Sequence, residues 1–254
     1  MPTDVKSKKN DQVTSVDQDE IEHFTKDSSH WWDEQGPFKP LHRLNPVRLK
    51  FIKQQICDHY DRDFDDLKAL TELNIIDIGC GGGLVCEPLA RMGATVTGVD
   101  ADKNAISVAT DHAENAALNI QYISDDLQDI SKQYDVVLAL EVIEHVNDIS
   151  LFMEQIIGLL KPGGLLIMST LNRTPKSYAL GIIAAEHILR WVPKGTHSWK
   201  KFVKPSEISN EARKHGLNPQ KIKGLIFNPL KNEFSLSETD LDVNYLIALS
   251  RNSL

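Results

Sequence analysis

The chain has 254 residues, 41% of them hydrophobic and 25% charged, which is typical of a globular protein with one substantial core. Acidic residues outnumber basic ones by 36 to 28, and a net charge of -8 repels a phosphate backbone, so nucleic acid is a poor candidate partner. The three cysteines form no CxxC pair, which excludes a disulfide framework and a zinc knuckle and indicates a reducing compartment.

The amino-terminal part is expected to comprise a disordered leader, residues 1–19, and a helical cover, residues 20–70, of the single domain 20–254. The leader is polar and lacks the apolar core of a secretory signal, so we expect a cytoplasmic start. In the cover the apolar spacing favours helices, broken by turn residues at Gly36-Pro37 and Lys39-Pro40.

Short apolar runs alternate with helical patterns in the middle of the chain, residues 71–170, which we interpret as a cofactor-binding core. The predicted strands are residues 73–78, 95–99, 120–123, 135–140 and 165–169, and the predicted helices are 84–92, 103–118 and 151–160. This alternation favours a parallel sheet covered on both faces. Further on, a helix at 205–215 and an edge strand at 243–249 are expected.

A glycine-rich turn, DIGCGGG at residues 77–83, follows the first predicted strand. Its glycines allow a sharp turn and a close approach of the backbone to a ligand at a helix N-terminus. A dinucleotide fingerprint would need glycine where the sequence has Leu84, which counts against NAD. Asp100 ends the second predicted strand, 21 positions after Gly79, where its carboxylate can accept both hydroxyls of a ribose.

Three chemically active residues, Glu141, Glu144 and His145, follow the fourth predicted strand. If a helix begins at Glu141, all three side chains share one face. They could then hold a divalent cation or act as acid-base groups. The alternative is a helix whose first turn carries acids that complement its dipole, with His145 packing. The spacing alone favours neither interpretation.

The motifs DIGCGGG, GVD, YDVV and LKPGG, in this order, resemble class I methyltransferases that bind S-adenosylmethionine. The resemblance covers residues 74–170 and implies a Rossmann-like α/β fold, with a mostly parallel seven-stranded sheet and helices on both faces. It also implies that Gly79 contacts the amino-acid end of the cofactor, that Asp100 holds its ribose and that Leu140 lines the site. Asp125 and Asp126 are both candidates for the family's adenine-binding acid.

Segments outside these motifs resemble the ubiquinone-biosynthesis O-methyltransferases. They are WWD at 31–33, FKPLHR at 38–43, NPVR at 45–48, STLNR at 169–173, VPKGTH at 192–197 and DVNY at 242–245. The resemblance implies methylation of a catechol-type hydroxyl on a polyprenylated ring: 3-demethylubiquinol, a polyprenyl-dihydroxybenzoate or a 2-polyprenyl-6-hydroxyphenol. It also implies that Arg48 binds the methionine carboxylate of the cofactor by charge-assisted hydrogen bonds.

The same resemblance implies a metal site at Glu141, Glu144 and His145, with magnesium as the expected ion. Hard cations such as magnesium favour oxygen ligands, and a histidine ligand is unusual for them. Zinc and manganese therefore remain alternative ions for this site. A bound cation would lower the pKa of the phenol and fix both catechol oxygens. Without a metal, His145 or Glu141 would take the proton.

Residues 171–200 are expected to form a lid or a membrane-contact insertion. Their apolar stretch, 178–192, suits an interfacial helix that receives a lipid-tailed phenolic substrate, and the alternative is a core helix of the cover. We expect peripheral association with the inner membrane, on the mitochondrial matrix side in a eukaryote, and a place in a ubiquinone-synthesis complex. The competing functions are methylation of another small phenol or acid, and a non-catalytic scaffold in such a complex.

Overall fold

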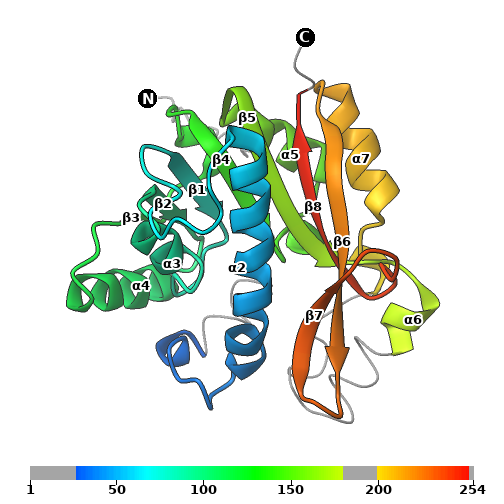
Figure 1. Ribbon diagram of the computed structural model, residues 1–254, viewed down its shortest axis with the longest axis horizontal. Coiled ribbons are helices and arrows are strands. Elements are labelled where there is room, and N and C mark those ends of the chain that lie inside the picture. Colours follow the sequence, from blue (N-terminus) through cyan, green and yellow to red (C-terminus); the bar gives the residue numbers. More distant parts are fainter. Residues whose placement is uncertain (1–26, 180–198, 252–254) are drawn as a thin grey trace, which may run out of the picture.

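The computed structural model describes residues 27–179 and 199–251 (Figure 1). Within these ranges one eight-stranded sheet has the order β3-β2-β1-β4-β5-β8-β6-β7. The strands are β1 (Asn74–Ile78), β2 (Thr95–Val99), β3 (Gln121–Ile123), β4 (Tyr134–Leu140), β5 (Leu160–Leu171), β6 (Asn218–Asn228), β7 (Glu233–Ser237) and β8 (Asn244–Ser250). The helices are α2 (Lys39–Tyr60), α3 (Cys86–Arg91), α4 (Lys103–Asn115), α5 (Ile149–Gly158), α6 (Pro175–Ser177) and α7 (Pro205–Lys214).

The predicted parallel sheet is confirmed, because β1 to β5 all pair in parallel. The prediction of an edge strand near the carboxyl terminus is wrong. β8 lies inside the sheet, antiparallel to β5 on one side and to β6 on the other. The described sheet has one strand more than expected, because β6 turns back into the short strand β7.

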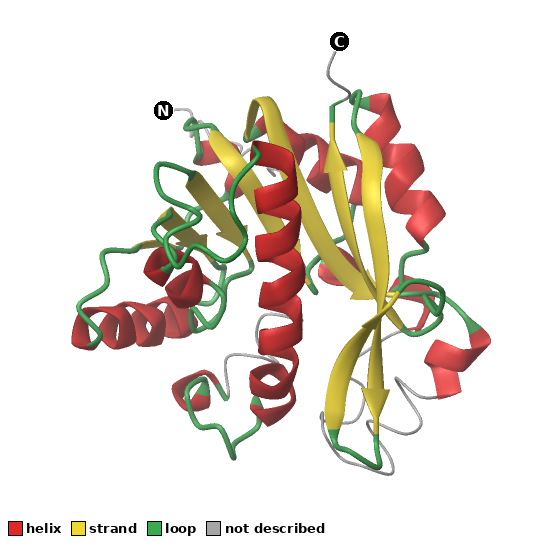
Figure 2. Cartoon of the chain, viewed as in Figure 1, coloured by secondary structure: helices red, strands yellow, loops and turns green. Residues whose placement is uncertain are grey.

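The sheet separates two hydrophobic cores, because alternate side chains of each strand point to opposite faces. In β5, Leu165 and Ile167 pack with α2 and α3, while Leu166 and Met168 pack with α5 and α7. We call these the α2 face and the α5 face (Figure 2). None of the described helices has the length and apolar character needed to cross a membrane.

The amino-terminal cover differs from its prediction at one point. α2 begins at Lys39, so Lys39-Pro40 starts a helix instead of breaking one. Proline is tolerated there because the first helical N–H groups have no partner within the helix. The helix continues past Pro46 to Tyr60 and ends at Asp61, which has a left-handed φ of 51°.

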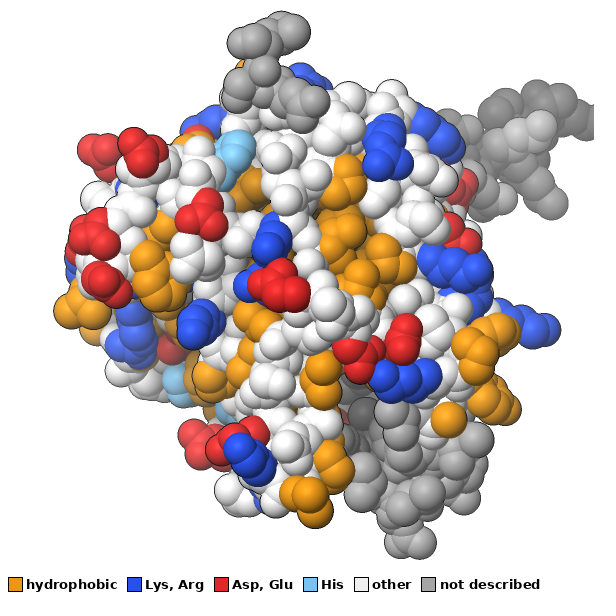
Figure 3. Space-filling view, turned by 45° about the vertical axis from the view of Figure 1, so that its right-hand side comes forward, with side chains coloured by type: hydrophobic (Ala, Val, Ile, Leu, Met, Phe, Trp, Pro, Cys, Tyr) orange, Lys and Arg blue, Asp and Glu red, His pale blue; other side chains and the backbone are white. Residues whose placement is uncertain are grey.

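The hairpin of β6 and β7 extends past the sheet on the side where α2 begins (Figure 1). Phe227 pairs with Phe234 across this hairpin. On the face shown in Figure 3, acidic, basic and hydrophobic side chains are interspersed over the described atoms. That part of the surface carries no continuous basic stripe of the kind that nucleic-acid binding requires.

Candidate active site

The glycine-rich turn brings the backbone of β1 against the end of β2. Gly79 has a left-handed φ of 71°, and the N–H groups of Gly79 and Cys80 both donate to Val99 O, at 2.8 and 3.0 Å. A Cβ at position 79 would lie 2.4 Å from Cγ2 of Val142. The glycine is therefore required both by its φ and by the close approach of the segment after β4.

Asp100 lies directly beside this turn. Its Oδ2 accepts from Gly81 N at 2.8 Å, and its Oδ1 accepts from Asp102 N, also at 2.8 Å. Loss of solvation raises the pKa of the Asp100 carboxyl, and these two backbone donors oppose the rise. Each oxygen keeps a lone pair, so the fixed carboxylate can still accept a ribose hydroxyl.

The amino-terminal cover packs on the same turn. A Cβ at Gly81 or Gly82 would lie 2.4 Å from an atom of the Trp31 side chain. Trp32 Nε1 donates to Gly82 O at 2.9 Å, and Ser28 Oγ donates to Asp102. Both tryptophans lie in the WWD segment at 31–33, and no spacing signal in the sequence links that segment to a turn fifty positions away.

Arg48 reaches the site from α2 and is only 5% exposed. Its Nη2 donates to Asn45 Oδ1 at 3.1 Å, and its Nε is buried with no hydrogen-bond partner among the described residues. Burial lowers the pKa of the guanidinium, while the charges of Glu141 and Asp77 raise it. A buried cation with an unused donor is suited to bind a carboxylate, so Arg48 fits the amino-acid end of S-adenosylmethionine.

Glu141 follows β4 directly after Leu140, which is buried in the core of the α2 face. The backbone of Glu141 is left-handed, with φ 57°. Its Oε1 accepts from Ser169 Oγ at 2.6 Å, and its Oε2 accepts from Asn244 Nδ2 at 3.2 Å. The side chain is thus fixed by donors from β5 and β8, and sequence reasoning missed both of these donors.

Glu144 is 3% exposed and lies in the single 3-10 turn Ile143–His145. Its Oε2 accepts from Thr170 Oγ1 at 2.8 Å, and within residues 27–179 and 199–251 its buried Oε1 has no hydrogen-bond partner. Burial, followed by the charge of Glu141, raises the pKa of Glu144 to about 7, although His145 opposes this. Burial and the charge of Glu141 therefore both favour the protonated form of Glu144.

The condition under which these acids would share one helical face is not met. No helix begins at Glu141, and the donors Ser169 and Thr170 are neighbours in β5, so their side chains point to opposite faces of the sheet. In the described ranges, no group of three or more His, Cys, Asp or Glu is arranged to hold a metal ion. The side chains as placed therefore do not fit the expected magnesium site.

The remaining candidates lie at the same edge of the sheet. The carboxyl ends of the adjacent strands β1, β2 and β4 bring Gly79, Asp100 and Leu140 together, as Rossmann-like topology requires. Asp126 accepts from Gln128 N at the start of the turn Leu127–Asp129, while Asp125 is exposed.

Comparison with known proteins agrees with this arrangement. The family model described as a methyltransferase domain matches residues 48–222. A ubiquinone biosynthesis O-methyltransferase from Nitrobacter winogradskyi is 47% identical over 236 residues, 92% of this chain and 90% of that protein. A protein of the same name from Bartonella bacilliformis is 46% identical over 241 residues, 94% of this chain and 97% of that protein.

Solved structures support the fold. A SAM-dependent methyltransferase from Thermotoga maritima superposes with a TM-score of 0.64 at 16% identity, over 92% of this chain and all of that chain. Magnesium protoporphyrin IX methyltransferase from Synechocystis PCC 6803, solved with bound SAM, superposes with a TM-score of 0.60 at 18% identity, over 94% of this chain and 100% of that chain. The predicted Rossmann-like methyltransferase fold is confirmed. The chain belongs to the family of ubiquinone biosynthesis O-methyltransferases and is an enzyme that uses S-adenosylmethionine as methyl donor.

Proposed function

We propose that this enzyme methylates a catechol-type hydroxyl of a polyprenylated ubiquinone precursor. The candidate acceptors are 3-demethylubiquinol, a polyprenyl-dihydroxybenzoate and a 2-polyprenyl-6-hydroxyphenol. The names of the relatives support this class of substrate. The observation that carries the proposal is the carboxylate of Glu141, held by Ser169 and Asn244 on the face of the sheet that also carries Arg48.

The donor would be held by residues at the carboxyl edge of the sheet. Arg48 would bind its carboxylate, the turn at Gly79 would lie along its amino-acid end, Asp100 would accept from its ribose, and Leu140 would line the site. S-adenosylmethionine supplies an electrophilic methyl group when bound. The unused Nε of buried Arg48 and the fixed carboxylate of Asp100 support this assignment.

We assign proton removal from the acceptor hydroxyl to Glu141. Its two hydrogen-bond donors fix the carboxylate, and Oε2, which accepts only from Asn244, keeps the capacity to accept one more bond. A hydroxyl that donates to this carboxylate is oriented and made more nucleophilic in the same step. His145 is the second candidate base, because it lies next to Glu144 in the same turn and a neutral imidazole can accept a proton.

Magnesium is part of what the family resemblance implies, with Glu141, Glu144 and His145 as ligands. These side chains would have to leave their present partners to converge on one ion, because Glu141 and Glu144 accept from opposite faces of the sheet. No step of the proposed reaction therefore depends on a metal.

We also propose that the enzyme works at a membrane surface, because a polyprenylated substrate partitions into lipid. The proposed location is the cytoplasmic side of the inner membrane, or the matrix side in mitochondria, with a ubiquinone-synthesis complex as partner. Most of the expected contact segment, residues 178–192, lies outside the described residues. Co-sedimentation of the purified protein with anionic liposomes tests the membrane contact, and its absence contradicts it.

The experiment that tests the function is methyl transfer to a short-tailed catechol precursor, followed by mass spectrometry of the product. We expect turnover, and a loss of about 100-fold or more in kcat for Glu141→Gln, the usual contribution of a general base. Glu154→Gln, at an exposed position of α5, is the control. If His145→Gln lowers kcat more than Glu141→Gln does, the base is the histidine. No turnover despite cofactor binding would point to another acceptor.

A further inference from the structure

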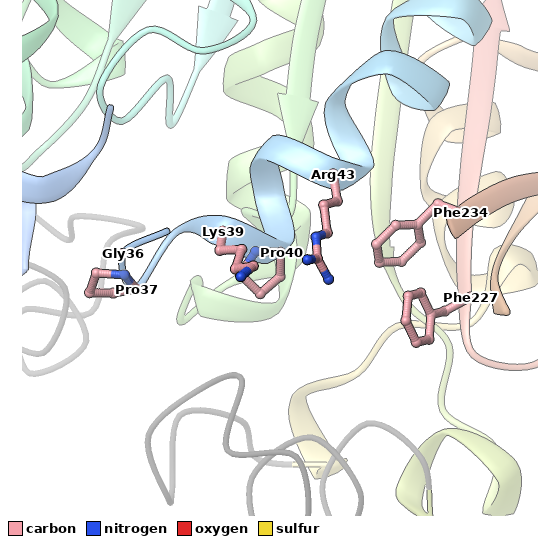
Figure 4. Close-up of a pocket in the computed structure, with 7 residues that line it drawn as sticks. All are labelled: Gly36, Pro37, Lys39, Pro40, Arg43, Phe227 and Phe234. Atoms are coloured by element: carbon pink, nitrogen blue, oxygen red, sulfur yellow. The ribbon is translucent and has the colours of Figure 1, made fainter. Parts of the chain in front are cut away.

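A cavity of about 350 Å³ lies between the start of α2 and the hairpin of β6 and β7 (Figure 4). It is lined by Gly36, Pro37, Lys39, Pro40, Arg43, Phe227 and Phe234. We propose that this cavity binds the first isoprenoid units of the substrate's polyprenyl tail. The inference rests on the proposed function, because it assigns a place to one part of the proposed substrate.

The cavity lies close to Asn244, one of the two side chains that hold the proposed base Glu141. Along β6, Phe227 follows Leu225 by two residues, or about 7 Å, and Leu225 pairs with Asn244. A ring bound near Glu141 and Asn244 can therefore extend a tail along β6 into the cavity.

The cavity also lies on the correct face of the sheet. Leu225 packs in the core of the α2 face, and Phe227 points the same way because side chains two apart in a strand share a face. Glu141, the proposed base, accepts from Ser169 and Asn244 on that face as well. Ring and tail would therefore lie on one continuous surface and would not have to pass through the sheet.

The aromatic and proline side of the wall fits an unsaturated hydrocarbon, and the two cations that line the cavity, Lys39 and Arg43, donate to partners outside the lining, Gln35 and Asn232. The rings of Phe227 and Phe234 lie 5.0 Å apart at 51°, and Pro40 lies across from them on α2 (Figure 4). Arg43 crosses the cavity to donate to Asn232 Oδ1, so its aliphatic stem lines the wall and its charge is directed to the hairpin turn. The volume is at the small end of small-molecule sites, which suits part of a tail.

The test compares two catechols, one with a farnesyl tail and one without a tail, as acceptors. The measured quantity is the ratio of their kcat/KM values, because a general loss of activity cancels in that ratio. Phe227→Ser is expected to lower the preference for the tailed catechol about tenfold or more, as hydrophobic-pocket changes do. Phe227→Leu, which keeps an apolar wall, is expected to retain most of the preference.

Leu230→Ser is the matched control, because Leu230 lies at the tip of the same hairpin, is 96% exposed and does not line the cavity. It is expected to leave the ratio unchanged. The cofactor affinity of each variant, measured by calorimetry, establishes that the sheet edge is still folded. If Phe227→Ser and Leu230→Ser give the same ratio as the unchanged protein, the tail assignment is overturned.

Direct binding separates this inference from the proposed reaction. Farnesol, a prenyl alcohol without a catechol ring, is titrated into the detergent-free protein, and we expect binding that Phe227→Ser weakens about tenfold. Absence of turnover together with Phe227-dependent farnesol binding would refute the proposed acceptor and retain the cavity as a prenyl site. If both catechols are turned over but Phe227→Ser binds farnesol as tightly as the unchanged protein does, the proposed function is retained and the cavity assignment is overturned.

Discussion

Trp31 lies directly on Gly82: a Cβ at position 82 would be 2.4 Å from the Cβ of Trp31 and 2.5 Å from its Cγ. The ring of Trp31 also stacks on Phe38, with centroids 3.8 Å apart and planes 7° from parallel. Trp31 therefore packs between the glycine-rich turn at residues 79–83 and Phe38, which directly precedes α2. Its packing and the proposed cofactor site depend on the same few glycines.

Gly82→Ala is expected to displace Trp31 and to weaken S-adenosylmethionine binding about tenfold, since overpacking costs about 1–3 kcal/mol. Gly82 has no positive φ, so the effect comes from the added methyl group and not from backbone strain. Calorimetry gives the affinity, and tryptophan fluorescence reports on the cover. Gly158→Ala is the control, because a Cβ there meets nothing within 4 Å. Equal affinities for the two variants would contradict the prediction.

Arg48→Met is expected to weaken S-adenosylmethionine binding by about 10- to 150-fold. A hydrogen bond to a charged group contributes about 1.5–3 kcal/mol, and methionine keeps the apolar stem but loses every donor. Lys50→Met, an exposed position two residues away on α2, is the control for loss of a positive charge. If both variants bind the cofactor equally well, Arg48 does not hold its carboxylate.

Much of the fold could be predicted from the sequence, because β1, β2 and β4 are short apolar runs separated by helical patterns or turns. The hairpin of β6 and β7 was missed. β6 carries Pro219 and two lysines, Lys221 and Lys223, so it lacks a continuous apolar signal. β8 was found but placed at the edge, since a local pattern does not reveal which strands pair on either side.

The positions of the turn at Gly79 and of the strand end at Asp100 were predictable, because both carry their signal locally. The arrangement of Glu141 and Glu144 was not predictable in this way. Their predicted arrangement depended on a helix at Glu141, whereas this residue has a φ of 57° and only a 3-10 turn follows. The partners that separate the acids, Ser169 and Thr170, lie in β5, and no spacing within residues 141–145 contains that information.

Asp77 should make stability depend on pH. Burial raises the pKa of its carboxyl from 3.8 to about 7, although the charge of Arg48 opposes the rise. An acid whose pKa is higher in the folded state stabilises the protein fully below its unfolded pKa, and this contribution is lost as pH rises toward 7. The free energy of unfolding should therefore fall over that interval, by an amount on the order of 3–4 kcal/mol for a shift of this size.

Asp77→Asn tests this dependence, because asparagine resembles the protonated acid at every pH. Denaturant unfolding should give nearly equal stabilities for variant and unchanged protein at pH 4, and a more stable variant at pH 8. For Asp65→Asn, at an exposed position, the stability difference from the unchanged protein should not grow between pH 4 and pH 8. A stability gap for Asp77→Asn that is the same at both pH values would exclude Asp77 as the cause.

Magnesium should not stabilise the protein in the absence of substrate. An ion that binds only the folded state raises the melting temperature through its binding free energy. Such binding would require Glu141 to leave Ser169 and Glu144 to leave Thr170, so two hydrogen bonds to charged groups oppose it. After chelator treatment, millimolar magnesium is expected to shift the melting temperature by less than about 1 °C. A larger shift that disappears in both Glu141→Gln and Glu144→Gln, but persists in Glu154→Gln, would establish that the two carboxylates do rearrange around the ion.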